Sequence, residues 1–162
     1  MRLHSLRWAL VAVAVSTGSF GCSGVGQAER TCVELITVEE VLSLGRKDVL
    51  VKVDNERTGS SICVWEGPQK SGAGFLVTRQ TASWFKYENA SGPKASFDRK
   101  RQAYDSVVGT DPLPGLGIEA RITRHERVPT VFARRAADVV YLMCGDCSRD
   151  QTITLAKLAV TP

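Results

Sequence analysis

The five cysteines constrain this chain of 162 residues more than any other feature, because their pairing decides which distant segments must meet. They are Cys22, Cys32, Cys63, Cys144 and Cys147. Cysteines persist as disulfides in exported proteins, whereas the cytosol keeps them reduced. An odd number in an exported chain leaves one cysteine for another task. The N-terminal residues must therefore indicate whether the chain is exported and which cysteine stands apart.

The N-terminus has the pattern of an export signal. Arg2 and Arg7 give a positive start, residues 8–15 form an apolar run, and residues 16–21 are small apart from Phe20. An apolar run of this length is too short to span a membrane as a helix. The order of basic start, short apolar run and small-residue end is typical of a signal peptide. We therefore predict that residues 1–21 are a signal peptide.

Cys22 follows this segment directly. Gly21 and Cys22 match the bacterial lipobox, in which a small residue precedes a cysteine that becomes lipid-modified, whereas Ser19 and Phe20 depart from it. Several acyl chains would form an effectively permanent anchor, since each buried methylene contributes about 0.8 kcal/mol. We expect residues 22–30 to be a lipidated N-terminus and flexible tether. The alternative is a secreted soluble protein with no lipid on Cys22.

The four remaining cysteines are expected to form disulfides. Cys144 and Cys147 lie in Cys-Gly-Asp-Cys, close enough to pair locally, which leaves Cys32 to pair with Cys63. Closing that loop of about 32 residues would stabilise the fold by roughly 3–4 kcal/mol in the chain-entropy model. The Cys32–Cys63 bridge is therefore the expected main staple of a single domain over residues 31–162.

Cys144 and Cys147 also suggest a thiol–disulfide redox site. An apolar strand precedes the C-x-x-C motif and a helix follows it, and a helix N-terminus lowers the pKa of a nearby thiol. Only 15 residues follow Cys147, however, so the later strands of a thioredoxin fold have no room downstream. Zinc binding by all four thiols is weakly supported, because only one pair has the required spacing. No metal site is predicted.

The hydrophobic pattern predicts an α+β fold. Thr37 and Glu40 form a capping box for a helix at about residues 38–44. A middle helix is expected from Pro93 to Gly109, with Phe97, Tyr104, Val107 and Val108 on one face, and a last helix at about residues 150–160. The segments with strand character are residues 49–53, 62–66, 75–80, 84–87, 118–122, 131–133 and 139–143. These elements predict one antiparallel sheet of about six strands with the helices on one face.

Four motifs, in order along the chain, resemble those of a family of small bacterial lipoproteins of unknown function. They are the opening run at residues 31–41, Cys63-Val64-Trp65, the Gly115-Leu116-Gly117 turn leading to Ala120, and the final amphipathic helix. The resemblance implies a lipid-anchored α+β domain with a disulfide matching Cys32–Cys63. It implies no known activity. The Cys144/Cys147 pair is not part of the family pattern.

Residues 99–135 hold eight basic and four acidic residues, which makes this stretch a candidate basic surface. Such a surface suits anionic lipid headgroups or an acidic partner, although an ordinary solvated face explains it too. Trp84, with Phe85 and Tyr87, is a candidate apolar patch for a ligand or partner, or else packs in the core. The candidate basic contacts are Arg121, Arg124, Arg127, Arg134 and Arg135.

No enzyme motif of the common hydrolase, metalloprotease, P-loop or dinucleotide-binding types is present, and His125 lies in a polar stretch expected to be a surface loop. The mild net charge of +4 does not point to nucleic acid. We therefore expect a non-catalytic, cofactor-free envelope lipoprotein that faces the periplasm or cell exterior and binds a protein partner or small ligand. The alternative is a thiol–disulfide redox protein using Cys144 and Cys147.

Overall fold

The structure is a computed structural model and describes residues 32–56, 59–67 and 74–161. The predicted signal peptide over residues 1–21 and the predicted tether over residues 22–30, including Cys22, lie outside the described residues.

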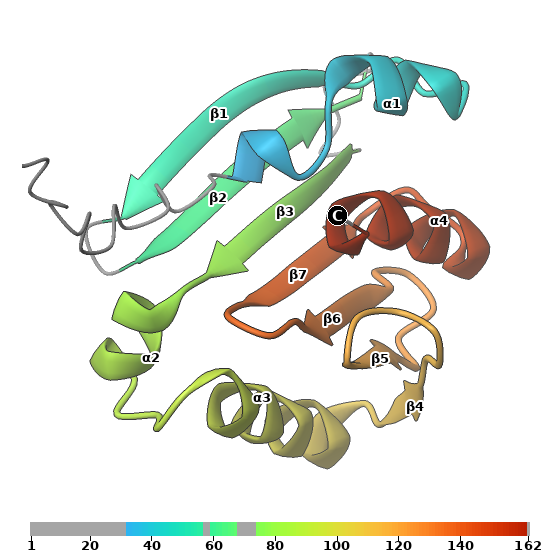
Figure 1. The fold of residues 1–162 in the computed structure, drawn as a ribbon. Helices are drawn as coiled ribbons and strands as arrows, with labels where there is room; N and C mark the ends of the chain where they lie inside the picture. Colours follow the sequence, from blue (N-terminus) through green and yellow to red (C-terminus); the bar gives the residue numbers. More distant parts are fainter. Residues whose placement is uncertain (1–31, 57–58, 68–73, 162) are drawn as a thin grey trace, which may run out of the picture.

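One antiparallel sheet of seven strands forms the centre of the domain (Figure 1). Its spatial order is β1-β2-β3-β7-β6-β5-β4, so that the C-terminal strand β7 inserts between β3 and β6. The strands are β1 (Val49–Glu56), β2 (Ser60–Glu66), β3 (Gly74–Gln80), β4 (Thr110–Pro112), β5 (Glu119–Thr123), β6 (Thr130–Arg134) and β7 (Val139–Cys144). The predicted α+β class with a single antiparallel sheet is confirmed, with one strand more than expected.

The described residues also form four α-helices and one 3₁₀ helix, which pack on the sheet. They are η1 (Cys32–Glu34), α1 (Val38–Ser43), α2 (Ala82–Tyr87), α3 (Pro93–Val107) and α4 (Arg149–Val160). The predicted capping box of α1 is present: the Thr37 hydroxyl accepts from the backbone N–H of Glu40, and the Glu40 carboxylate accepts from that of Thr37. In α3, Phe97 is buried, but Val107 is 80% exposed and does not share its face, contrary to expectation.

The helices cover both faces of the sheet, so the prediction that they share one face is wrong. On one face, Val131 and Ala133 of β6 pack in a cluster with residues of α4. On the other face, Phe132 of the same strand packs at a tilt against Phe97 of α3 and stacks with Tyr104, with ring centroids 5.2 and 5.4 Å apart. The physical reason is that β6 presents apolar side chains in both directions, and each face needs a layer to cover it.

The segment predicted as a strand at residues 84–87 is the helix α2 instead. The chain leaves the sheet at Thr81, whose backbone N–H and hydroxyl both bond to the carbonyl of Gly59. Aromatic residues at positions 84, 85 and 87 also fit one turn of helix, and the Trp84 and Tyr87 rings lie 5.4 Å apart across it. Residue type alone therefore indicated the wrong element here.

The strand β4 was not expected from the sequence. It is three residues long and pairs only with β5, at the edge of the sheet. Between them, Gly117 has a φ of +61°, and a Cβ there would approach the carbonyl oxygen of Arg134 to 2.8 Å. Glycine is therefore required for the turn that leads into β5.

The disulfide between Cys32 and Cys63 joins η1 to the middle of β2, with their Cα atoms 5.7 Å apart. The backbone N–H of Cys32 also donates to the hydroxyl of Ser61 on the same strand. Leu35 and Ile36, which follow η1, are buried in the core cluster that includes Cys32 and Cys63. The bridge thus fastens the first described segment to the sheet.

Tyr141 of β7 is buried on the α3 face, and its hydroxyl has no hydrogen-bond partner among the described residues. Burial raises the pKa of Tyr141 well above its ordinary value of 10.0, and Glu88 and Tyr104 raise it further. An unpaired buried hydroxyl costs free energy, because it loses hydrogen bonds to water without replacement.

We expect Tyr141→Phe to stabilise the domain by about 1 kcal/mol, since it removes this unpaired group and keeps the ring. The raised pKa adds a pH dependence. The contribution of this group to the free energy of unfolding is fully present below about pH 10, the pKa of tyrosine in the unfolded chain. It falls as the pH rises further, because the unfolded state loses the phenolic proton first. This fall should be smaller in Tyr141→Phe. Urea unfolding at neutral and at alkaline pH measures both effects, and a variant less stable than the wild type at neutral pH contradicts the account.

A candidate site around the Cys144–Cys147 disulfide

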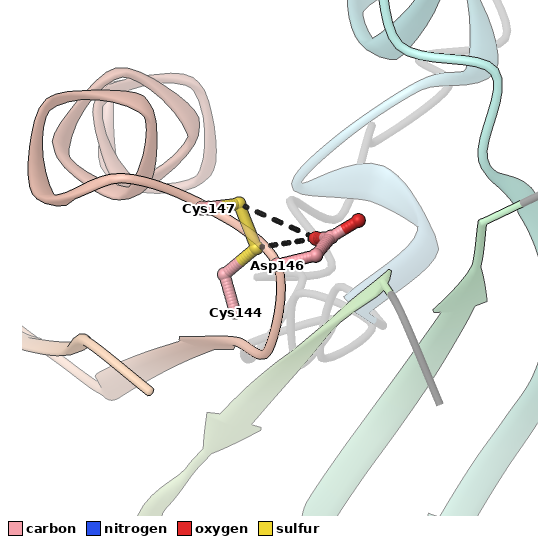
Figure 2. A group of neighbouring side chains, drawn as sticks. All are labelled: Cys144, Asp146 and Cys147. Atoms are coloured by element: carbon pink, nitrogen blue, oxygen red, sulfur yellow. Dashed lines mark hydrogen bonds between the residues drawn. A yellow bond between two sulfur atoms is a disulfide. The ribbon is translucent and has the colours of Figure 1, made fainter. Parts of the chain in front are cut away.

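The disulfide between Cys144 and Cys147 lies at the junction of β7 and α4 (Figure 2). The helix begins one residue after Ser148, whose hydroxyl accepts from the backbone N–H of Gln151. The Gln151 side chain in turn accepts from the backbone N–H of Ser148. This capping box explains why α4 begins here, so that the strand, C-x-x-C and helix follow in the expected order.

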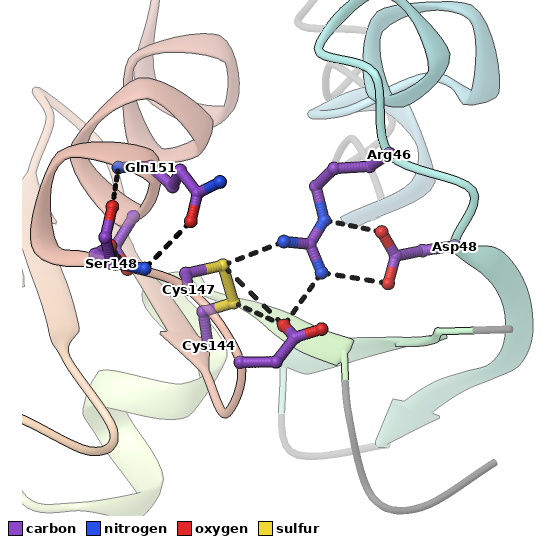
Figure 3. Close-up of polar contacts among 8 residues, drawn as sticks. Arg46, Asp48, Cys144, Cys147, Ser148 and Gln151 are labelled. Carbon is purple, nitrogen blue, oxygen red and sulfur yellow. Dashed lines mark hydrogen bonds and ion pairs between the residues drawn. A yellow bond between two sulfur atoms is a disulfide. The ribbon is translucent and has the colours of Figure 1, made fainter. Parts of the chain in front are cut away.

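Arg46, in the connection between α1 and β1, reaches this disulfide from the other end of the chain (Figure 3). Its Nη1 donates to the Sγ of Cys147 at 3.2 Å, and its Nη2 donates to Oδ1 of Asp146 at 2.8 Å. Its Nε and Nη2 also bond to the two carboxylate oxygens of Asp48, at 2.5 and 3.0 Å. One guanidinium thus ties the entry of β1 to the turn between β7 and α4.

The electrostatics of this group keep Arg46 charged. The hydrogen bonds that Arg46 donates to Asp48 raise the pKa of Arg46, burial lowers it, and the hydrogen bond to Asp146 raises it further. The guanidinium also lies 5.6 Å from the centroid of the Phe75 ring, a cation–π geometry. Asp48 is buried, so its ion pair with Arg46 replaces the hydration that its side chain loses on folding.

The two sulfur atoms have limited access and a mixed electrostatic environment. Cys144 is fully buried and Cys147 is only 6% exposed. Asp146 Oδ1 lies 3.3 Å from the Sγ of Cys144 and 3.9 Å from that of Cys147. A guanidinium beside Cys147 favours a thiolate, whereas the carboxylates of Asp48 and Asp146 oppose it. The site thus combines one contact that favours a thiolate with contacts that oppose it.

Cys144, Asp146 and Cys147 also form a three-residue group whose candidate ligand atoms lie within 4.8 Å of one another. Zinc takes thiolate sulfur and usually four ligands in structural sites. In the structure both sulfurs are engaged in the disulfide, so this group offers a metal two thiolates only after reduction.

The arginines expected to form one basic surface are divided between the two ends of a hairpin. Arg124 and Arg127 lie in the connection from β5 to β6, whereas Arg134 and Arg135 lie at the far end of β6. Most of these charges are locally paired. The pairs are Arg121 with Asp105, Arg124 with Asp111, Arg134 with Glu119, and Arg135 with Asp138. Arg127 is exposed.

Trp84 packs from α2 against the aromatic cluster under α3, which agrees with the core interpretation better than with a surface contact. Its indole nitrogen is buried and has no hydrogen-bond partner within the described segments. His125 is exposed, and its Nδ1 accepts from the backbone N–H of Val128, as suits a residue that shapes a loop.

Sequence reasoning missed Arg46 and Asp48. They stand two positions apart in a short polar stretch before a strand, which reads as an ordinary loop. Their partners Asp146 and Cys147 lie about 100 residues further along the chain. These residues meet only when the fold brings the two segments together, so no local pattern in the sequence indicated the pairing.

No protein-family model, no curated protein and no solved structure gives a significant match to this chain.

We expect Arg46→Met to destabilise the domain by about 3 kcal/mol, because it leaves the buried carboxylate of Asp48 without its partner. Lys94→Met is the matched control: it removes an exposed ion pair with Asp98 and should cost at most about 0.5 kcal/mol. The double variant Arg46→Met/Asp48→Leu should recover much of the loss. Urea unfolding of the four proteins measures the differences, and equal effects of Arg46→Met and Lys94→Met would falsify a role for the buried pair.

Proposed function

We propose that this protein is an exported, non-catalytic domain, anchored to a bacterial membrane through lipid on Cys22, that binds a protein partner or small ligand in the cell envelope. The observation that carries the proposal is the use of the cysteines. The two disulfides take up Cys32, Cys63, Cys144 and Cys147, so that Cys22 is the one cysteine of the sequence left for modification.

The disulfides also support export, because such bonds persist in oxidising compartments. One of them closes a long loop and joins η1 to β2, which is the kind of bridge that stabilises secreted domains. The signal-peptide pattern ending at Gly21 and the resemblance to small bacterial lipoproteins point in the same direction. Among the described residues, no helix combines the length and apolar character needed to cross a bilayer.

The contacts at the candidate site support a stabilising role rather than a catalytic one. Arg46 is bonded to Asp48, Asp146 and the sulfur of Cys147, so its donors are directed at groups of the protein itself. The disulfide is shielded by the same contacts. These features suit a domain whose working part is a surface rather than a reactive group.

A thiol–disulfide redox function is the second candidate, and two observations favour it. Cys147 precedes the N-cap of the 12-residue helix α4 and accepts a hydrogen bond from a guanidinium, both of which lower the pKa of a thiol once it is reduced. Burial of both sulfurs and the carboxylates of Asp48 and Asp146 weigh against it.

We expect Cys22→Ala to move the protein from the membrane fraction to the soluble fraction of the cell envelope, because the acyl chains have no other attachment residue. Mass spectrometry of the wild type should find the mature N-terminus at Cys22 with its thiol and amine acylated. The matched control is Cys144→Ser/Cys147→Ser, which removes two sulfurs and should leave the protein in the membrane fraction. A mature wild-type protein with an unmodified Cys22 contradicts the proposal.

The redox alternative makes a separate prediction about the Cys144–Cys147 bond. We expect its reduction potential to lie below about −300 mV, in the range of structural disulfides and under the value of about −270 mV for thioredoxin. Equilibration with dithiothreitol, followed by alkylation and peptide mass spectrometry, measures this potential. A value between about −120 and −230 mV, in the range of oxidising and isomerising enzymes, supports the redox function instead.

A further inference from the structure

The exposed aliphatic side chains are concentrated in the first elements of the domain. Across the described ranges, seven of the ten large apolar residues that remain exposed lie between positions 33 and 53, and the other three are scattered. We call these seven the α1–β1 border. They are Val33, Val38, Leu42, Leu44, Val49, Val51 and Val53.

The helix α1 shows the arrangement most clearly. Val41 points into the core and is fully buried, whereas Val38 and Leu42, four positions apart and so on one face of the helix, are 46% and 54% exposed. The solvent side of a surface helix ordinarily carries polar residues. Here that side carries two aliphatic ones, followed by the exposed Leu44.

The strand β1 continues the border. It is the outermost strand of the sheet, and a register shift between Leu50 and Lys52 places Val51 outside the regular pairing with β2. In Figure 1, β1 and α1 run along the same border of the domain, and α3 lies at the opposite border. The register pairs Val49 with Glu66 and Val53 with Cys63, so these two side chains point to opposite faces of the sheet. The border is therefore the free edge of β1 together with the outer side of α1.

The position of Cys22 identifies the surface that this border meets. Cys32 lies ten positions after Cys22, and ten peptide units span at most about 35 Å when fully extended. The chain enters the described domain at η1 and passes directly into α1. The α1–β1 border is thus built from the first elements after the proposed anchor, within reach of the bilayer.

We infer that the α1–β1 border rests on the lipid bilayer, with its aliphatic side chains at the boundary between headgroups and acyl chains. This inference depends on the lipid anchor proposed above, since a few exposed aliphatic residues bind lipid weakly unless an anchor holds them close. It assigns an orientation: α1 and β1 face the membrane, and α3 and β4 face away.

The charges around the border indicate which lipid property matters. The exposed ionic side chains beside the aliphatic ones are Glu34, Glu39, Lys47, Lys52 and Asp54, and Lys52 is paired with Asp54. Acidic charge exceeds basic charge in this set, so it provides no net attraction to anionic headgroups. Contact therefore depends on apolar insertion, and it does not require anionic lipid.

Two exposed positions provide a matched pair of probes. Leu42→Trp places an indole on the outer face of α1, and Val107→Trp places one at an 80%-exposed site at the end of α3. Trp65 and Trp84 pack in the two core clusters and give the same background in both variants. The acylated full-length proteins are reconstituted in phosphatidylcholine vesicles with and without bromine on the acyl chains.

We expect brominated lipid to quench the indole at position 42 by about twofold or more, because side chains of an interfacial helix reach about 5–10 Å into the boundary region. The indole at position 107 should keep the same emission in both vesicles. The quenching at position 42 should not change when phosphatidylglycerol is added. Equal quenching at both positions, no quenching at position 42, or quenching only with anionic lipid each overturns the inference.

Two further measurements separate the sources of failure. Mass spectrometry of the same samples counts the acyl chains on Cys22. If Cys22 is unmodified, the anchor proposal fails, and the orientation fails with it unless brominated lipid still quenches position 42. Light scattering of the Cys22→Ala protein without lipid detects a second copy. A dimer in which the indole at position 42 is shielded assigns the border to protein–protein contact and overturns the inference.

Discussion

The strands β6 and β7 are buried on both faces, and the positions of the helices depend on this constraint. Val131 and Ala133 point to one face of the sheet and Phe132 to the other. Exposing the apolar side chains of either face to water costs free energy, so each face needs a covering layer. The helix α4 covers one face, while α2 and α3 cover the other. Because β7 is the last strand in the sequence but lies in the middle of the sheet, the C-terminal segment completes the core rather than extending its edge.

The first elements depend on tertiary cross-links, because they are short. η1 has three residues and α1 has six, too few for helices that are stable by themselves. The Cys32–Cys63 disulfide holds their start against β2, and Arg46 holds their end against the turn between β7 and α4. Between these two attachments, Leu35, Ile36 and Val41 are buried in the core, whereas Val33, Val38, Leu42 and Leu44 stay exposed. The attachments thus stabilise a layer whose outer side is free for contact.

The covalent and electrostatic features at the two ends of this layer suit different tasks. The disulfide between η1 and β2 reduces the conformational entropy of the unfolded chain in any compartment that keeps the bond oxidised. The guanidinium of Arg46 satisfies a buried carboxylate and contacts the second disulfide, so removal of one partner affects several others. This coupling explains why a C-x-x-C motif at a helix N-terminus fits a structural role here. The same neighbours that favour a thiolate at Cys147 also cover it and bring carboxylates close.

Much of the fold was predictable from local pattern, where one segment carried all the information. The capping box of Thr37 and Glu40 determined where α1 begins, and alternating or continuous apolar runs located most strands. The spacing of Cys144 and Cys147, together with the cysteine count, led to the two disulfides. The uninterrupted apolar runs at residues 131–133 and 139–143 also contained the signal of two-sided burial, although one-sided coverage was inferred from them. Tertiary structure alone decided that residues 82–87 form a helix and that Arg46 joins Asp48 to Asp146. It also decided that most arginines of residues 121–135 form ion pairs and that they lie at two ends of a hairpin. The physical reason is range: capping and periodicity act within a few residues, whereas these outcomes depend on which segments, up to about 100 residues apart, the sheet brings into contact.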